Sequence, residues 1–255
     1  MTIILGMDYM KIDLTNVVGG LNHQTFNLKH IIKYSYINKL KLIKPIIRLT
    51  RQHTFDDKEK ISDLSEYYDL DNIKVNKNKV EIYEDNEELE YTIKNKNYKW
   101  SLLYMDEMFK LSINDVDIPP SINVIETAKK ISLMMDKEYM CIHVRRGDLV
   151  KNNQIDMDTQ PENIKKVIKL YNPKSVYIMT NRINEINSLS EMEGVKFYTD
   201  FEILREIKDN YFLYSIEKQI MKNAKIRCST FKTGIPYFHC YLTNHVKFPN
   251  AKNVT

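Results

Sequence analysis

An apolar run over residues 139–144 that ends abruptly in charge constrains the fold of this chain more than any other feature. A run of this length and composition predicts a buried strand. Two adjacent guanidinium groups at the end of such a strand are costly to leave unpaired, and they are favoured where a dianionic group binds. The polar residues at this strand end are His143, Arg145, Arg146 and Asp148.

Beyond residue 120 the chain alternates predicted helices with predicted strands. This alternation indicates an α/β fold with a parallel, doubly wound sheet, in which ligands bind at the carboxyl ends of the strands. The arginine pair therefore predicts a diphosphate site that needs no metal, because the guanidinium groups supply the positive charge. The expected helices are 121–135, 158–170, 210–223 and 232–242, and the expected strands are 139–144, 175–179, 195–198 and 224–228.

Ser121 begins the first of these helices and is expected to cap it, because a serine side chain accepts hydrogen bonds from free amides at a helix start. The apolar periodicity that follows predicts which side chains face the core. The predicted inner face comprises Ile125, Ala128, Ile131, Ser132 and Met135.

The N-terminal segment predicts a second α/β region. An expected strand over residues 10–18 is followed by a glycine turn, by a helix with a rough 3.6-residue period, and by a strand over 41–49. This order is that of a βαβ unit. Pro45 lies inside the last strand and predicts an edge or a strand start, because proline cannot donate to a ladder.

Residues 53–110 are less regular. Alternating polar and apolar residues predict strands with one solvent-facing side at 80–83 and 90–93. The only Pro-Pro pair of the chain ends the segment 115–120 and predicts a domain boundary there. We therefore expect two domains, 1–118 and 119–255.

A second candidate anion site lies at residues 229–231, where a predicted strand passes into a predicted helix. Hydroxyls and free amides at a helix start hold phosphate well, although the same residues can simply cap the helix. Pairing with the arginine motif in one sheet favours the phosphate. At the arginine motif the competing interpretation is a structural ion-pair network in which Asp148 neutralises an arginine. For Gly19-Gly20, the competing interpretation is a tight turn between strand and helix without a ligand.

Composition narrows the function classes. The net charge of +4 is spread along 255 residues, so it does not by itself imply nucleic acid and also suits an anionic small molecule. The six histidines lack metal-ligand spacing. Cys141, Cys228 and Cys240 form no C-x-x-C pair, which favours buried free thiols in a reducing compartment. Neither a secretory signal nor an apolar run of about 18 residues is visible, so a cytoplasmic protein without a membrane span is expected.

Three motifs, taken in order, resemble those of the GDP-fucose-dependent fucosyltransferases. That family includes the α1,2-, α1,6- and protein-O-fucosyltransferase groups. The resemblance covers most of residues 10–50 and 120–240, and departs from the usual residues at Thr25 and Asn181. The motifs that carry it are Gly19-Gly20-Leu21-Asn22 with Gln24, the H-V-R-R-G-D of residues 143–148, and Ser229-Thr230-Phe231; residues 176–181 are similar to a further strand of the family.

This resemblance implies a GT-B-like α/β fold with two Rossmann-like halves and a nucleotide-sugar cleft between them. The half at 1–118 would be the acceptor side, and the half at 119–255 would bind the GDP-sugar. The implied activity is that of an inverting, metal-independent glycosyltransferase, which moves fucose from GDP-fucose to a glycan or protein hydroxyl. No cofactor is expected besides this donor substrate. Arginine and helix-terminus donors would stabilise the departing diphosphate as a metal does elsewhere.

The resemblance also assigns roles to individual residues. Arg145 would grip the β-phosphate, and Asn22 with its glycine turn would face the sugar nucleotide. His23 is a candidate general base. His143 would contact the nucleoside, and Arg146 would support the charge or the loop. The implied catalytic residues are thus Arg145, Asn22 and His23, and the implied substrate-binding residues are Gly19, Gly20, Leu21, His143, Arg146, Asp148, Ser229, Thr230 and Phe231.

Three alternatives stay open. One is a related transferase that uses another GDP-sugar, and another is a catalytically inactive nucleotide- or glycan-binding protein on the same fold. The third is nucleic-acid binding, which predicts an affinity that falls steeply with salt. The leading interpretation expects a GDP-sugar donor and a glycan or protein acceptor as partners, and neither nucleic acid nor a membrane.

Overall fold

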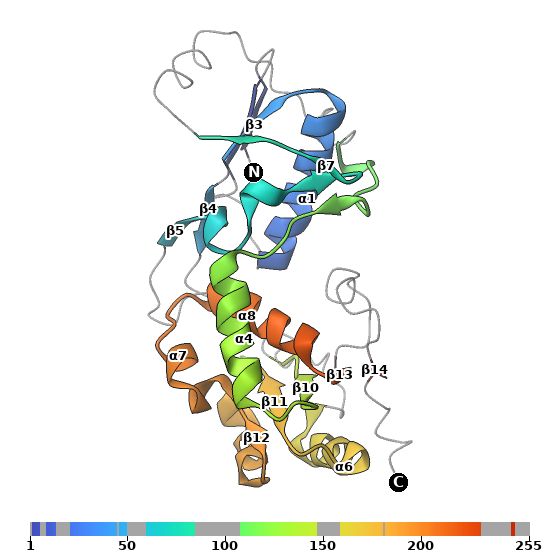
Figure 1. Cartoon of the computed structure of the whole chain (residues 1–255), viewed down its shortest axis with the longest axis vertical. Coiled ribbons are helices and arrows are strands. Elements are labelled where there is room, and N and C mark those ends of the chain that lie inside the picture. Colours follow the sequence, from blue (N-terminus) through green and yellow to red (C-terminus); the bar gives the residue numbers. More distant parts are fainter. Residues whose placement is uncertain are drawn as a thin grey trace. The chain divides into compact units, whose positions relative to one another are not determined.

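The structure is a computed structural model, and it describes residues 2–5, 9–13, 21–44, 46–49, 60–84, 108–146, 159–180, 182–230 and 246–247. The chain forms two compact units, whose elements are labelled in Figure 1. The first unit comprises Met1–Val124 and Asp209–Phe212, and the second comprises Ile125–Lys208 and Leu213–Thr255. The sequence does not predict the return of Asp209–Phe212 to the first unit.

The first unit is built on a mixed sheet in which β2 is central. Its strand order is β5-β4-β2-β3-β8, and β1 also pairs with β2. Strand β2 runs parallel to both β3 and β4, and helix α1 lies between β2 and β3 in the chain, so the predicted βαβ unit is confirmed. The bounds are β1 Thr2–Leu5, β2 Tyr9–Asp13, α1 Leu21–Ile37, β3 Lys41–Ile43, β4 Ile46–Leu49, β5 Lys60–Asp63 and β8 Ile82–Tyr83.

The single strand expected over residues 41–49 is wrong, because two strands occupy this segment. Strands β3 and β4 lie on opposite sides of β2. The Lys44 amide still donates to the Tyr83 carbonyl of β8, at 2.7 Å. Pro45 follows, and a residue without an N–H cannot continue a ladder. The strand predicted at 80–83 is present only at Ile82–Tyr83, as β8, and the one predicted at 90–93 lies outside the described residues.

The segment that contains the Pro-Pro pair belongs to a small antiparallel sheet in the first unit. Strand β9, Val116–Asp117, pairs with β6, Lys74–Val75, which also pairs with β7, Asn78–Lys79. The Pro-Pro pair itself also contacts the first unit, because the Pro119 carbonyl accepts a hydrogen bond from the Asp69 amide at 2.8 Å. Two short 3-10 helices precede this sheet, η2 Leu64–Glu66 and η3 Leu70–Asn72.

The second unit contains the predicted parallel sheet. Its five strands have the order β12-β11-β10-β13-β14, and every pairing is parallel. The predicted α/β class is therefore confirmed. The strands are β10 Met140–His143, β11 Val176–Met179, β12 Val195–Lys196, β13 Ile226–Ser229 and β14 Val246–Lys247; the helices are α4 Ile122–Met134, α6 Pro161–Tyr171, α7 Glu202–Arg205 and α8 Asn210–Asn223, with 3-10 helices η5 Ile183–Glu185, η6 Asn187–Glu191 and η7 Tyr198–Asp200.

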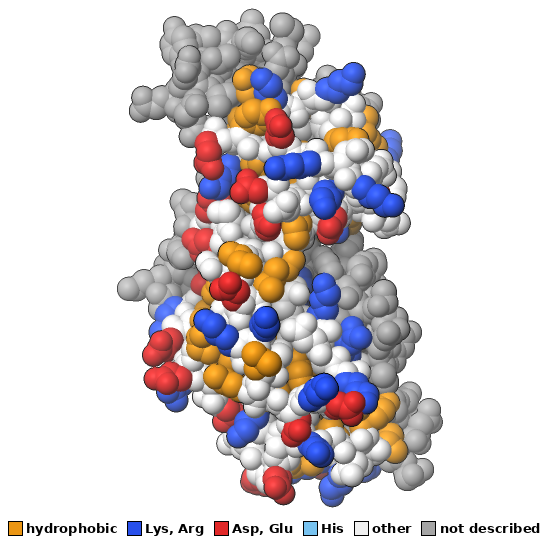
Figure 2. Space-filling view, viewed as in Figure 1, with side chains coloured by type: hydrophobic (Ala, Val, Ile, Leu, Met, Phe, Trp, Pro, Cys, Tyr) orange, Lys and Arg blue, Asp and Glu red, His pale blue; other side chains and the backbone are white. Residues whose placement is uncertain are grey.

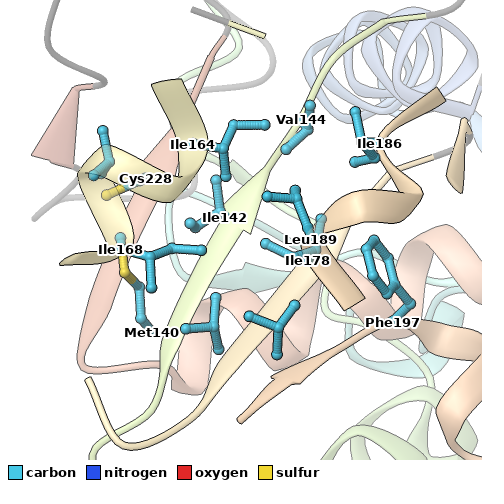
Figure 3. Close-up of a cluster of buried hydrophobic side chains, with 13 residues drawn as sticks. Met140, Ile142, Val144, Ile164, Ile168, Ile178, Ile186, Leu189, Phe197 and Cys228 are labelled. Carbon is cyan, nitrogen blue, oxygen red and sulfur yellow. The ribbon is translucent and has the colours of Figure 1, made fainter. Parts of the chain in front are cut away.

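Alternate residues of β10 face opposite sides of this sheet. Met140, Ile142 and Val144 join a buried apolar cluster with Ile164 and Ile168 of α6 (Figure 3). Because side chains alternate along a strand, Cys141 and His143 point to the other face. Helix α8 covers that other face, where the Tyr139 hydroxyl donates to the Ile220 carbonyl at 2.5 Å. Helices on both faces make the sheet doubly wound, as predicted.

Helix α4 begins as predicted and buries most of the predicted inner face, with Ile125 as the exception. The Val124 amide donates to Ser121 Oγ at 3.4 Å, which confirms Ser121 as the cap. Ile125 was expected to face the core and instead is 42% exposed. Val124 and Ile125 are adjacent apolar residues, and packing buries Val124 in place of Ile125. The buried residues are Val124, Ala128, Ile131 and Met135, and Ser132 is half-buried.

Gly194, just before β12, has a backbone that a side chain would strain. Its φ is +78°, and an added Cβ would lie 2.5 Å from the Lys174 carbonyl oxygen. We expect Gly194→Ala to lower the free energy of unfolding by about 2 kcal/mol or more, measured by urea denaturation. The exposed neighbour variant Glu193→Ala is the control, and equal stabilities of the two variants would contradict the prediction.

The described surface carries charges of both signs. In the view of Figure 2, lysine and arginine side chains lie interspersed with aspartate and glutamate rather than in one block. This distribution agrees with the modest net charge of +4. No helix in the described ranges is long and apolar enough to cross a membrane.

Candidate functional site

The two motifs expected to bind phosphate lie side by side in the second sheet. Strands β10 and β13 are adjacent and parallel, and their register sets His143 opposite Ser229. His143 Nδ1 lies 3.3 Å from Ser229 Oγ, within hydrogen-bonding distance, and both side chains are buried. Residues that are 86 positions apart in the chain therefore meet at the carboxyl edge of the sheet.

Thr230 joins these strand ends. Its amide donates to the His143 carbonyl at 3.0 Å, and its Oγ1 accepts from the Arg145 amide at 2.9 Å. On the other side of β10, the Val144 amide donates to the Met179 carbonyl of β11 at 2.9 Å. The backbone that leads into Arg145 is thus held from both neighbouring strands.

A Thr230→Val substitution tests this contact. Valine keeps the shape of threonine but cannot accept the hydrogen bond of the Arg145 amide. An amide left without its partner costs about 1–3 kcal/mol, so we expect a loss of that size in the free energy of unfolding. Thr230→Ser retains the hydroxyl and is the matched control. A valine variant as stable as the serine variant would contradict the prediction.

The two adjacent arginines occupy different environments. Arg146 is buried, and its Nε donates to Glu185 Oε2 at 2.7 Å. Its Nη1 donates to the carbonyl and hydroxyl oxygens of Thr159, at 2.9 and 3.1 Å. Arg145 is partly exposed, and its Nη1 donates to the Arg146 carbonyl at 3.0 Å. Asp148, which the sequence suggested as a neutralising group, lies outside the described residues, and the carboxylate on Arg146 is that of Glu185.

The candidate residues of the first unit lie at the start of α1. Leu21 is buried, and Asn22 is partly exposed. His23 is in the helix, but its side chain is outside the described part of the structure, as are Gly19 and Gly20 of the preceding turn. Phe231, at the end of the third motif, is likewise outside it.

Helix α1 is fixed near these residues by buried polar contacts within the first unit. Gln24 Nε2 donates to the Tyr211 hydroxyl at 3.2 Å, and Thr25 Oγ1 lies 2.7 Å from the Tyr68 hydroxyl. Thr25, which departs from the family pattern, is therefore a buried helix residue that packs within its own unit.

Sequence reasoning missed Glu185 and Thr159. Glu185 is the first carboxylate after β11, the strand next to β10. Thr159 lies just before α6. Glu185 could have been found from the sequence, because it is a carboxylate in the segment after a neighbouring strand. That segment lies at the edge of the sheet where a buried arginine requires a counter-charge. Nothing in the local sequence singles out Thr159.

A buried carboxylate lies on the α8 side of the same sheet. Glu217 of α8 accepts a hydrogen bond from the Tyr177 hydroxyl of β11 at 2.9 Å. Burial raises the pKa of Glu217 from its ordinary 4.5 to about 8, although the Tyr177 hydrogen bond opposes this rise. Tyr177 lies within β11 rather than at its carboxyl end, so Tyr177 and Glu217 do not belong with His143, Ser229 and Thr230 at the carboxyl edge of the sheet.

The described cysteines are free and buried, as the sequence predicted for Cys141 and Cys228. Burial raises the pKa of the Cys228 thiol to about 12 and also raises the pKa of the Cys141 thiol well above its ordinary value, so both are protonated near neutral pH. Cys240 lies outside the described residues. Among the described side chains, no group of three or more His, Cys, Asp or Glu is arranged to hold a metal ion.

Comparison with known proteins identifies a shared fold. No family model and no curated protein sequence matches the chain. Solved structures of POFUT1, a GDP-fucose protein O-fucosyltransferase, do match it. The structure with GDP has a TM-score of 0.55 at 11% identity, and the alignment covers 91% of this chain and 93% of that one. The structure with GDP-fucose has a TM-score of 0.54 at 10% identity, with the same coverage.

The ligand-free form of POFUT1 is equally similar. It has a TM-score of 0.57 at 10% identity, over 93% of this chain and 97% of that one. Identities this low show the fold and not the activity. The chain therefore shares the α/β, GT-B-like fold of POFUT1 over nearly its whole length.

Proposed function

We propose that this protein is an inverting glycosyltransferase that moves fucose from GDP-fucose to a hydroxyl of a glycan or a protein. The observation that carries the proposal is the meeting of His143, Arg145 and Ser229-Thr230 at the carboxyl edge of a parallel sheet. Such edges are where α/β sheets bind their ligands. The shared fold with a protein solved with GDP and with GDP-fucose supports the same donor.

In this proposal Arg145 binds the diphosphate of the donor. As the bond from sugar to phosphate breaks, negative charge grows on the departing GDP, and a guanidinium group already in place stabilises it. Thr230 holds the backbone of Arg145 through the amide contact of 2.9 Å. His143, which lies beside Ser229, faces the nucleoside, and the hydroxyls of Ser229 and Thr230 complete the phosphate cradle.

The acceptor hydroxyl attacks the sugar from the side opposite the leaving diphosphate, which inverts the anomeric carbon. Asn22, at the start of α1, contacts the sugar nucleotide. His23 removes the proton of the acceptor hydroxyl as the new bond forms. No metal takes part, because the arginine supplies the charge that a metal supplies in other transferases.

Release of GDP from a panel of GDP-sugars tests the proposal. We expect release from GDP-fucose when sugar or protein acceptors are present, and an unchanged rate in EDTA. Release of GDP from another GDP-sugar would support the assigned site but show that the donor is not GDP-fucose. If nothing is released, a thermal-shift titration with GDP separates an inactive nucleotide-binding protein, which GDP still stabilises, from a wrong assignment of the site.

A further inference from the structure

Arg146 uses its guanidinium atoms Nε and Nη1 for contacts within the protein. Only 8% of the residue is exposed. Its Nε contacts the Glu185 carboxylate at 2.7 Å, and its Nη1 contacts two oxygen atoms of Thr159. A buried guanidinium is tolerated where a carboxylate and further acceptors compensate it, and these contacts provide both. We call Arg146, Glu185 and Thr159 the Arg146 clamp.

The clamp joins three segments of the second unit. Arg146 follows the end of β10, Glu185 ends the 3-10 helix η5 after β11, and Thr159 lies just before α6. Glu185 has a second cationic neighbour, since its Oε1 lies 3.8 Å from Arg182 Nε. The segment after β10 is therefore tied to the segment after the adjacent strand by a contact between a buried guanidinium and a partly exposed carboxylate.

The clamp acts directly on Arg145. The Arg146 carbonyl accepts a hydrogen bond from Arg145 Nη1 at 3.0 Å, so the position of the Arg146 backbone bears on the direction of the Arg145 guanidinium. The Arg145 amide is held by Thr230 on the side of β13. Residues 145 and 146 are thus fixed on the β13 side by Thr230 and on the β11 side by the clamp.

We propose that the Arg146 clamp positions Arg145 to bind a nucleoside diphosphate, and that Arg146 is a positioning residue rather than a phosphate ligand. This inference rests on the proposed function. For Arg146 to bind phosphate through Nε, it would have to give up its 2.7 Å contact with Glu185, whose other cationic neighbour, Arg182, lies farther away at 3.8 Å. A phosphate close to the Glu185 carboxylate would also be repelled. Arg145, which is the more exposed of the two arginines, is the group that can meet the ligand.

The Glu185→Gln substitution tests the clamp in the full chain. Glutamine keeps the size of the side chain and one oxygen acceptor but removes the charge that compensates Arg146. We expect the dissociation constant for GDP to rise about tenfold, since a misdirected guanidinium loses a charge-assisted hydrogen bond. We also expect faster hydrogen exchange at the Arg145 amide, which measures positioning without any ligand. If the Arg145 amide of Glu185→Gln exchanges at the wild-type rate, the proposed positioning role of the clamp is wrong.

Loss of stability alone must be separated from loss of positioning. Val176→Ala creates a cavity at the start of β11, away from the carboxyl edge, and is the control for general destabilisation of this unit. It is expected to lower the melting temperature while leaving GDP affinity unchanged below the unfolding transition.

The double variant Arg146→Met, Glu185→Met provides the decisive comparison. Replacing the buried guanidinium together with its partly exposed partner leaves no uncompensated buried charge, so this variant is expected to regain stability. If the clamp positions Arg145, this variant regains melting temperature but keeps the weak GDP binding of Glu185→Gln. If GDP affinity returns together with stability, the clamp has only a structural role and the proposal is wrong.

The wild-type measurement keeps this inference distinct from the proposed function. A wild-type protein that does not bind GDP overturns the proposed function and, with it, the ligand assigned to the clamp. Normal GDP binding by the wild type together with undiminished binding by Glu185→Gln overturns the clamp alone.

Discussion

Arg145→Ala is expected to weaken GDP binding by about 10²- to 10³-fold and abolish fucose transfer, because removing one partner of a hydrogen-bonded charge pair costs several kcal/mol. Arg145 lies at the carboxyl edge of the sheet, where its amide and guanidinium both make hydrogen bonds. Isothermal titration with GDP measures the first effect, and GDP release from GDP-fucose measures the second.

Two further variants sharpen this prediction. Arg145→Lys keeps the positive charge but not the planar fork of donors, so we expect its affinity to lie between those of the wild type and the alanine variant. Arg205→Ala removes an exposed arginine from α7 of the same unit and should leave GDP affinity unchanged. Full turnover by Arg145→Ala would show that the phosphate site has been placed wrongly.

Glu217→Gln is expected to stabilise the protein at neutral and alkaline pH. The pKa of Glu217 rises from 4.5 to about 8 because the side chain is buried. The folded protein therefore holds a proton that the unfolded chain releases. The favourable contribution of this proton is complete below pH 4.5, declines as the pH rises, and is lost above about pH 8.

The size of this effect follows from the shift in pKa. By pH 7 the wild type loses about 3 kcal/mol of unfolding free energy through this one group, relative to its value below pH 4.5. Glutamine does not titrate, and its oxygen still accepts the hydrogen bond from Tyr177. The advantage of Glu217→Gln over the wild type should therefore grow by about 3 kcal/mol between pH 4.5 and pH 7.

Urea denaturation of both proteins across this pH range measures the difference. Glu202→Gln changes an exposed carboxylate of the same unit and is the matched control. A difference between Glu217→Gln and the wild type that is constant from pH 4 to pH 9 would show that Glu217 titrates alike in the folded and unfolded states.

Elements governed by local patterns could be predicted closely. Helix α8 spans Asn210–Asn223 as expected, since its amphipathic period is uninterrupted. Helix α6 begins at Pro161, which suits a first helical turn, and ends at Tyr171 before Asn172 in the left-handed conformation. The apolar run at 139–144 became the fully buried strand β10. Each of these features depends on neighbours in the chain.

Features that depend on distant partners could not be predicted. The segment 41–49 splits into two strands because β2 offers both of its edges, and Pro45 only marks where the ladder must break. At the start of α4, Val124 rather than Ile125 is buried, because surrounding elements select between two adjacent apolar residues. Hydrophobic pattern alone does not distinguish these two positions.

The sequence by itself determined that a buried strand ends in two arginines and that a hydroxyl pair ends another strand of the same parallel sheet. The resemblance implied different roles for Arg145 and Arg146, but only the tertiary structure decided which groups contact each of them. Adjacent arginines are chemically equivalent in a sequence, but successive residues at a strand end point in different directions. Folding brings Glu185 and Thr159 to Arg146, while Arg145 stays partly exposed, because the segments after neighbouring strands meet at one edge of the sheet.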